Sequence, residues 1–179
     1  MTEMVILVDQ YDSQIGVEEK LKAHREGKLH RAFSVFIFND KGEMLLQKRA
    51  FNKYHAGGLW TNACCSHPRP QETVEQAARR RLWEEMGFEC HLQKAFHFIY
   101  KAHLDGDLIE HEFDHVFIGH YNGAVSPNAN EVAEYRWLQA QALHNELKQS
   151  RENYTVWFKL ALGRALKFEA TNRRREASF

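Results

Sequence analysis

Cysteine and proline are both scarce in this chain of 179 residues, which contains three of each. Three cysteines, two of them adjacent, do not make the even set of a disulfide scaffold, so we expect reduced thiols and a cytoplasmic protein. Lysine and arginine (24) balance aspartate and glutamate (24), so no global positive field attracts nucleic acid or an anionic membrane. No apolar run approaches the roughly 18–20 residues of a membrane-spanning helix.

The chain has no linker rich in proline, glycine or serine and no internal repeat, so we expect a single domain over residues 1–179. The N-terminus lacks a basic segment ahead of an apolar core, so no signal peptide is expected. Its composition, 44% hydrophobic and 27% charged, is that of an ordinary globular protein. The cluster Arg173, Arg174 and Arg175 is interpreted as a solvated tail.

Hydrophobic patterns predict strands in the first two-thirds of the chain and helices toward its end. We expect strands over residues 5–8, 33–38, 43–49, 96–103, 111–121 and 134–138, with turns at 39–42 and 105–107. We expect helices over 72–86, 139–149 and 153–169, the first ending at Gly87. This is an α+β layout in which mixed β-sheets pack between helices and the C-terminal segment is helical.

Histidine is unusually frequent, at 11 residues, and imidazole suits both metal binding and proton transfer near neutral pH. Glu110 and Glu112, two residues apart on an expected strand, point to the same side and can reach one ion. Together with three histidines, they would form a nitrogen and oxygen site suited to Mn²⁺ or Zn²⁺. The spacing is not that of a compact metal motif, and each histidine taken singly also fits a surface or core position.

The helix ending at Gly87 carries a second group of charges. Glu84 and Glu85 are paired carboxylates, and carboxylates combined with phosphate oxygens are what Mg²⁺ prefers. Arg81 lies between them on a helical wheel. The alternative is a solvated helix face with ordinary i,i+3 and i,i+4 ion pairs.

This segment resembles the Nudix box, G-x5-E-x7-R-E-U-x-E-E-x-G-U, in which U is a bulky apolar residue. Two positions depart from the pattern: Ser66 replaces the first glycine, and Arg81 replaces a glutamate that binds metal in the hydrolases. The loss of that glutamate argues against hydrolysis, although the fold can survive while the chemistry differs. The matching residues are Glu72, Arg80, Leu82, Glu84, Glu85, Gly87 and Phe88.

The order of motifs from Lys20 to Trp157 is similar to that of type I isopentenyl-diphosphate isomerases. The sharpest part is W-T-N-x-x-C-x-H-P, which begins at Trp60. A Nudix hydrolase does not need the cysteine in this string. The other matching residues are Lys20, His24, Leu29, His30, Cys65, His67, Pro68, Glu85, Glu110, Glu112 and Trp157.

The resemblance implies a 1,3-allylic proton shift between isopentenyl and dimethylallyl diphosphate. It places Cys65 and Glu112 on opposite sides of the substrate, with Glu112 as the leading proton donor in the forward direction, Tyr100 beside it, and Cys65 taking the proton from C2. Trp157, and in a weaker expectation Trp60, would face the carbocation. The metal ligands that it implies are His24, His30, His67, Glu110 and Glu112.

For the diphosphate, the resemblance implies that Glu85 helps to hold Mg²⁺ and that four cations contact the phosphate oxygens. Arg81 would then bind phosphate where a hydrolase binds metal. These four cations are Lys20, Arg49, Lys53 and Arg81. Two other interpretations stay open, namely a Nudix hydrolase of a nucleoside or prenyl diphosphate and an inert metal-binding module.

Overall fold

Strand β3 (His30–Phe38) is the central element of the protein, for which a computed structural model describes residues 2–176. Among those residues, nine strands form one mixed, curled sheet. The other strands are β1 (Met4–Val8), β2 (Gln14–Glu19), β4 (Glu43–Arg49), β5 (Trp60–Asn62), β6 (Cys64–Ser66), β7 (Leu92–His103), β8 (Ile109–His120) and β9 (Val132–Gln139). The α-helices are α1 (Lys20–Glu26), α2 (Val74–Met86), α3 (Ala140–Gln149) and α4 (Val156–Glu176).

The pairing of β3 brings distant segments of the chain together. β3 runs parallel to β8 over its whole length, from the pair His30 and Glu112 to the pair Phe38 and His120. It also pairs antiparallel with β6, where Cys65 lies opposite Ser34. One strand therefore aligns a histidine, a glutamate and a cysteine that are far apart in sequence.

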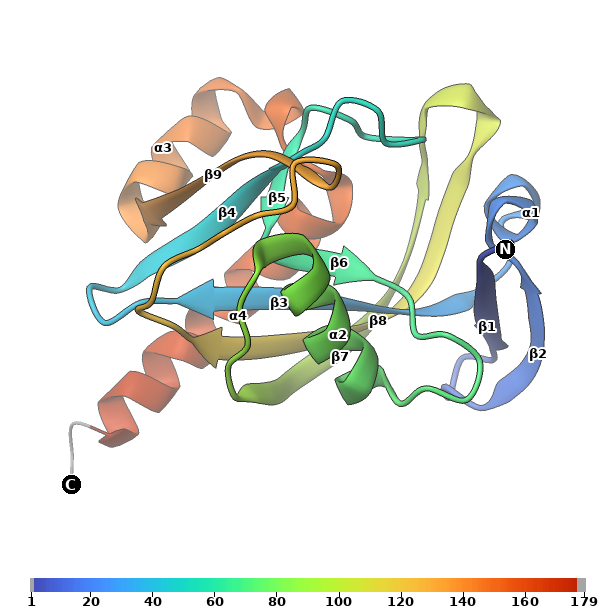
Figure 1. The fold of residues 1–179 in the computed structure, drawn as a ribbon, viewed down its shortest axis with the longest axis horizontal. Coiled ribbons are helices and arrows are strands. Elements are labelled where there is room, and N and C mark those ends of the chain that lie inside the picture. Colours follow the sequence, from blue (N-terminus) through green and yellow to red (C-terminus); the bar gives the residue numbers. More distant parts are fainter. Residues whose placement is uncertain (1, 177–179) are drawn as a thin grey trace.

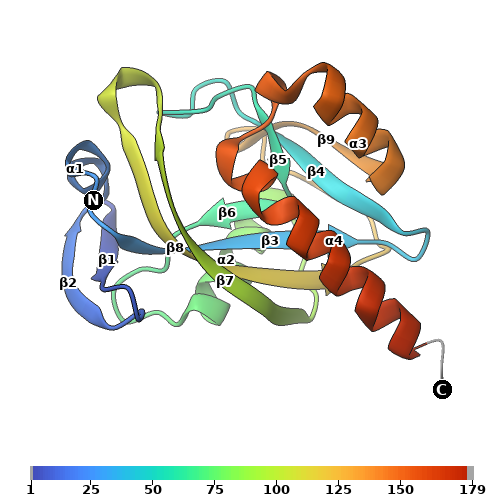
Figure 2. The same cartoon turned by 180° about the vertical axis from the view of Figure 1, so that it is seen from behind.

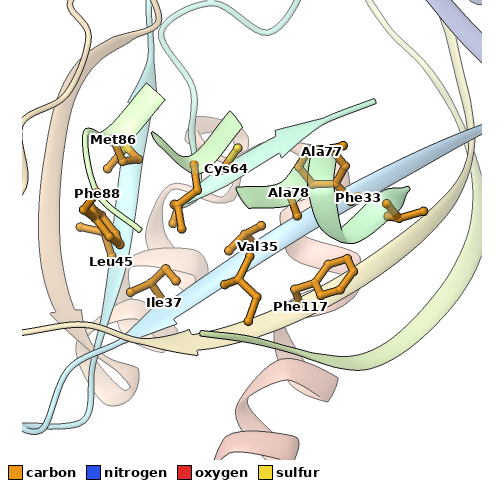
Figure 3. Close-up of a cluster of buried hydrophobic side chains, with 14 of the residues drawn as sticks. Phe33, Val35, Ile37, Leu45, Cys64, Ala77, Ala78, Met86, Phe88 and Phe117 are labelled. Atoms are coloured by element: carbon orange, nitrogen blue, oxygen red, sulfur yellow. The ribbon is translucent and has the colours of Figure 1, made fainter. Parts of the chain in front are cut away.

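β3 is buried on both faces, and its side chains alternate between two cores. Val35 and Ile37 pack with α2, while Phe36 and Phe38 pack with α4. Figures 1 and 2, viewed from opposite sides, show α2 and α4 on opposite faces of the sheet, and Figure 3 shows the α2 core. A strand covered on both faces has a continuous rather than an alternating apolar sequence.

Helix α2 begins and ends where local chemistry requires it. The Thr73 side chain accepts a hydrogen bond from the backbone N–H of Gln76, whose side chain in turn accepts from the Thr73 backbone. This capping box contributes about 1 kcal/mol to the stability of the helix. Gly87 ends α2 with φ of 74°, a left-handed conformation that favours glycine. Both ends help to fix the carboxylates of the last turn.

The predicted fold class is confirmed, as are all the predicted strands and helices, with shifted ends. β3 and β7 begin earlier than predicted, and α4 begins later and extends to Glu176. Four short elements, β2, α1, β5 and β6, were not predicted. The prediction of a solvated tail is wrong for Arg173. This residue lies on α4, pairs with Glu169 and donates to the carbonyl of Asn39. None of the helices described is long and apolar enough to cross a membrane.

Candidate active site

A cavity of about 730 Å³ opens between the β7–β8 hairpin, the loop after β4 and the start of α4. Most of the predicted site residues line it. His24, His30 and Glu85 lie behind the lining. The predicted residues on its wall are Lys20, Arg49, Lys53, Cys65, His67, Arg81, Tyr100, Glu110, Glu112 and Trp157.

The five predicted metal ligands come together at one end of the cavity. They come from α1, β3, the segment after β6, and β8, and one ligand atom from each lies within 4.8 Å of all the others. All five are buried. The parallel β3–β8 register accounts for part of this, because it sets His30 beside Glu112. The cluster consists of His24, His30, His67, Glu110 and Glu112.

Two histidines of the cluster are oriented by backbone carbonyls. Nδ1 of His24 donates to the carbonyl of Lys20 at 2.7 Å, and Nδ1 of His30 donates to that of Lys28 at 2.9 Å. Each imidazole therefore directs Nε2 at the cluster. A ligating histidine is commonly held in this way through its other ring nitrogen.

The donor set fits a divalent cation. Nε2 of His30 and Nε2 of His67 lie 3.2 Å apart, and Oε2 of Glu110 is buried without a hydrogen bond. Burial lowers the pKa of His67 to about 3, so its imidazole is neutral at pH 7, the form that binds metal. Three imidazoles and two carboxylates suit Mn²⁺ or Zn²⁺.

Glu112 connects this cluster to the cavity. Its Oε1 lies 2.8 Å from Nε2 of His67, and its Oε2 accepts a hydrogen bond of 2.7 Å from the Tyr100 hydroxyl. Burial alone would raise its pKa, and Glu110 adds to this, but hydrogen bonds from His30 and His67 outweigh both, so the pKa is lowered. Burial holds the pKa of Tyr100 well above its usual value, so the phenol keeps its proton.

The Cys65 thiol lies on the wall of the same cavity and is held by three groups. Nε1–H of Trp157 donates to Sγ at 3.0 Å, and Sγ donates to Oδ1 of Asn62 at 3.1 Å. The Thr61 hydroxyl lies 3.7 Å from Sγ. Burial raises the pKa of Cys65 to about 12, so Cys65 is a neutral thiol in the substrate-free protein.

Cys64 and His111 face away from the cavity, as alternation along a strand predicts. Cys64 is fully buried in the core beneath α2. His111 donates from Nδ1 to the carbonyl of Gly27. Neighbouring residues on one strand thus serve the core and the site.

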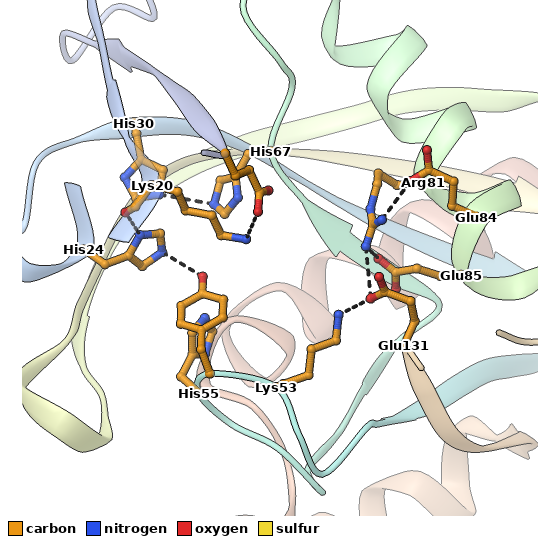
Figure 4. Close-up of polar contacts among 12 residues, drawn as sticks. Lys20, His24, His30, Lys53, His55, His67, Arg81, Glu84, Glu85 and Glu131 are labelled. Carbon is orange, nitrogen blue, oxygen red and sulfur yellow. Dashed lines mark hydrogen bonds and ion pairs between the residues drawn. The ribbon is translucent and has the colours of Figure 1, made fainter. Parts of the chain in front are cut away.

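The other end of the cavity holds the Nudix-box carboxylates around Arg81. Its guanidinium donates to Glu84 and Glu85, each at 2.7 Å, and to Glu131 at 3.2 Å. Lys53 also pairs with Glu131. Figure 4 shows this group on one side and His24, His30 and His67 on the other.

Two other predicted cations are already in contact with protein groups. Lys20 donates to Glu3 at 3.0 Å, and the Arg49 guanidinium lies 5.4 Å from the centre of the Trp157 ring. The expectation that Trp60 faces the cavity is wrong. Its ring packs under the Arg136 guanidinium at 4.1 Å, and Trp60 is not among the described residues on the cavity wall.

Sequence reasoning missed three residues of the site. His55 and Glu131 lie in loops, where no periodicity marks a side chain as inward-facing. Gln47 lies on β4 and donates to Oε2 of Glu85 at 2.8 Å. Its position within a strand gave no sign of a role, because strand alternation does not distinguish a buried polar partner from a core residue.

Residues 28–158 match the family model described as NUDIX domain. The chain is 50% identical to an isopentenyl-diphosphate Delta-isomerase of Burkholderia multivorans over 165 residues, which cover 92% of this chain and 94% of that protein. It is 48% identical to isopentenyl-diphosphate Delta-isomerase 1 of Aromatoleum aromaticum, covering 99% of this chain and all (100%) of that one.

Among solved structures, a protein from Deinococcus radiodurans has a TM-score of 0.69 at 19% identity, covering 82% of this chain and 90% of that one. A MutT protein from Methanosarcina mazei has a TM-score of 0.60 at 23% identity, covering 82% and 95%. At these identities the likeness shows that the fold is shared.

Proposed function

This chain belongs to the NUDIX family and to its isopentenyl-diphosphate Delta-isomerases, and on that premise we propose that it interconverts isopentenyl diphosphate and dimethylallyl diphosphate. One observation carries the proposal. A protonated thiol and a carboxylate hydrogen-bonded to a phenol line one cavity, beside a buried cluster of histidines and glutamates. A proton shift across an allyl unit needs such a pair of groups.

The chemical difficulty lies in the substrate. An isolated carbon–carbon double bond is a very weak base, and its protonation creates a tertiary carbocation. An acid and a base must therefore face the substrate in a pocket that excludes water. An aromatic face that stabilises positive charge is also required, and Trp157, on the wall of the cavity, would supply it.

We assign the two proton-transfer roles to Glu112 and Cys65. The forward direction begins with Glu112 protonated and Cys65 as a thiolate, the state in which the reverse reaction leaves the two groups. The carboxyl group of Glu112, supported by the Tyr100 hydroxyl, gives a proton to the terminal methylene carbon. The cation then loses a proton from C2 to the sulfur of Cys65, and the double bond forms between C2 and C3. In reverse the two roles exchange, and in that direction Cys65 begins as the protonated thiol that burial favours.

We assign metal binding to His24, His30, His67, Glu110 and Glu112. A bound Mn²⁺ or Zn²⁺ would supply positive charge that holds the Glu112 carboxylate and adjusts its proton affinity. The neutral imidazole of His67 and the unpaired Oε2 of Glu110 support this assignment.

We assign diphosphate binding to the opposite end of the cavity. Lys53 and Arg81 lie at this end, whereas Lys20 lies on the cavity wall beside the histidine cluster. With Arg49, also on the wall, these cations would contact phosphate oxygens. Glu85, behind Arg81, would share Mg²⁺ with the diphosphate, since Mg²⁺ prefers one or two carboxylates plus phosphate oxygens. The ion pairs with Glu3 and Glu131 would then be exchanged for contacts with substrate.

The position of Arg81 supports isomerisation over hydrolysis of a diphosphate. Hydrolysis needs metal at the box carboxylates to activate water. Here the Arg81 guanidinium forms ion pairs with Glu84, Glu85 and Glu131 instead. The Cys65 thiol on the wall would have no role in hydrolysis.

Proton NMR of isopentenyl diphosphate incubated with the protein, Mg²⁺ and Mn²⁺ tests the function directly. We expect the vinylidene signals to be replaced by the methyl signals of dimethylallyl diphosphate, with no free phosphate released. Persistence of the vinylidene signals, or release of phosphate, would refute the proposal. A parallel reaction in D₂O should place deuterium at C2 and at the terminal carbon.

A further inference from the structure

His55 is a buried histidine in the loop between β4 and β5, and it contacts three parts of the site. Its Nε2 lies 3.0 Å from Oε1 of Glu110. Its backbone carbonyl accepts a hydrogen bond of 3.3 Å from Arg49, and the edge of its ring meets Trp157 at a centroid distance of 5.9 Å. The proton-transfer scheme gives this residue no role.

The two oxygens of Glu110 have different environments. Oε1 is turned toward His55, whereas Oε2 has no hydrogen bond and lies 3.5 Å from Nε2 of His24. Because an ionised carboxylate can only accept, Nε2 of His55 must carry the hydrogen. A contact to one oxygen fixes the direction of the other.

We propose that His55 is a positioning residue for the metal site, whose Nε2–H holds Oε1 of Glu110 so that Oε2 stays directed at Nε2 of His24 in the cluster. This inference rests on the metal role proposed above for the cluster. It adds a residue that is not itself a ligand, on a loop that also carries Lys53 of the proposed diphosphate end. Partners that orient a ligand in this way typically contribute 10–100-fold to metal affinity, a range of about one to two orders of magnitude.

The competing explanation is that His55 only fills space between Trp157 and Tyr54, whose ring centroids lie 5.9 and 4.2 Å from its own. Two substitutions separate the explanations. His55→Phe keeps an aromatic ring of similar size and removes the N–H donor. His55→Gln removes the ring and retains a side-chain N–H at similar reach.

The experiment titrates Mn²⁺ into chelator-stripped protein and follows free Mn²⁺ by its electron paramagnetic resonance signal. Spin-echo modulation from imidazole nitrogen identifies binding at the histidine cluster. We expect His55→Phe to weaken Mn²⁺ affinity by about 10-fold or more and His55→Gln to recover most of it. His97→Phe is the matched control, because His97 is an exposed histidine stacked on Phe113, and it should bind like the parent protein.

A double-mutant cycle tests the route through Glu110. In a Glu110→Gln background, adding His55→Phe should cause little further loss of affinity, because the contact is already changed. Equal Mn²⁺ affinity for His55→Phe and the parent, or full loss with His55→Gln, would overturn the positioning role and leave the metal site intact. A parent protein that does not bind Mn²⁺ through imidazole would overturn both.

Discussion

The two ends of the cavity both gather carboxylates but neutralise them differently. At the histidine end, Glu110 and Glu112 face imidazoles and the Tyr100 phenol. At the Nudix-box end, Glu84, Glu85 and Glu131 share the guanidinium of Arg81. The neutralising group at the box end is a guanidinium, which keeps its positive charge at neutral pH.

This difference indicates where an added cation is needed. Burial alone would raise the pKa of Glu110, but the neighbouring imidazoles of His24 and His55 reverse the shift and keep it well below the usual value. The carboxylate is thus ionised in a buried site, and a buried charge is costly unless it is paired. The histidine end therefore suits a resident divalent cation, while the box end suits Mg²⁺ that arrives with a diphosphate.

The largest effect on turnover is expected from replacing the two residues that transfer protons. Cys65→Ser and Glu112→Gln should each reduce kcat by roughly 10³-fold or more, because each removes a proton-transfer group. The NMR assay above measures this. Cys64→Ala is the control, since Cys64 lies in the core and its loss should leave turnover largely intact. A Cys65→Ser protein with parental kcat would contradict the assignment.

Replacing Arg81 should destabilise the box end. Arg81→Gln leaves Glu84, Glu85 and Glu131 without their shared cation, and breaking such a partly buried network should cost about 3 kcal/mol of unfolding free energy. Urea denaturation at pH 7 measures the loss. Arg79→Gln, on the exposed side of α2, should change stability little. If both variants are equally stable, the guanidinium is not what neutralises this end.

Removing metal should destabilise the histidine end of the cavity. Chelation should lower the unfolding free energy, and Mn²⁺ added back at about 100 times its dissociation constant should restore about 2.7 kcal/mol. Denaturation with and without Mn²⁺ measures this gain. His24→Asn should lose most of it, and Arg79→Gln should keep it. An equal gain in the His24 variant would place the ion elsewhere.

The smallest effect concerns the thiol near the centre of the cavity. The pKa of Cys65 is raised by burial to about 12, above its ordinary value, so the thiol stays protonated at pH 7. Alkylation by iodoacetamide should be slow there and rise by about tenfold per pH unit up to pH 10 without a plateau, because only the thiolate reacts. Mass spectrometry assigns the rate to Cys65. A plateau below pH 8 would show that the thiolate is stabilised before substrate binds.

Site residues could be predicted from the sequence where their segment has a regular local pattern. The pair Glu110 and Glu112 was predictable because strand alternation fixes which side both face, and Gly87 was predictable as a helix end. His55 was not, because its loop has no period and its partner Glu110 is 55 positions away in the sequence. The short strands β5 and β6 could not be predicted for a related reason, because three residues are too few to show alternation.

The sequence by itself determined the α+β class, the long strands and helices, and the residue types available for proton transfer and metal binding, because periodicity and composition act over a few neighbouring residues. Only the tertiary structure decided that His30, Glu112 and Cys65 meet, through the pairing of β3 with β8 and β6. It also decided that Arg81 neutralises three carboxylates while Glu110 keeps one unpaired oxygen. Charge balance in a buried site depends on distances between segments that are remote in sequence, and packing alone sets those distances.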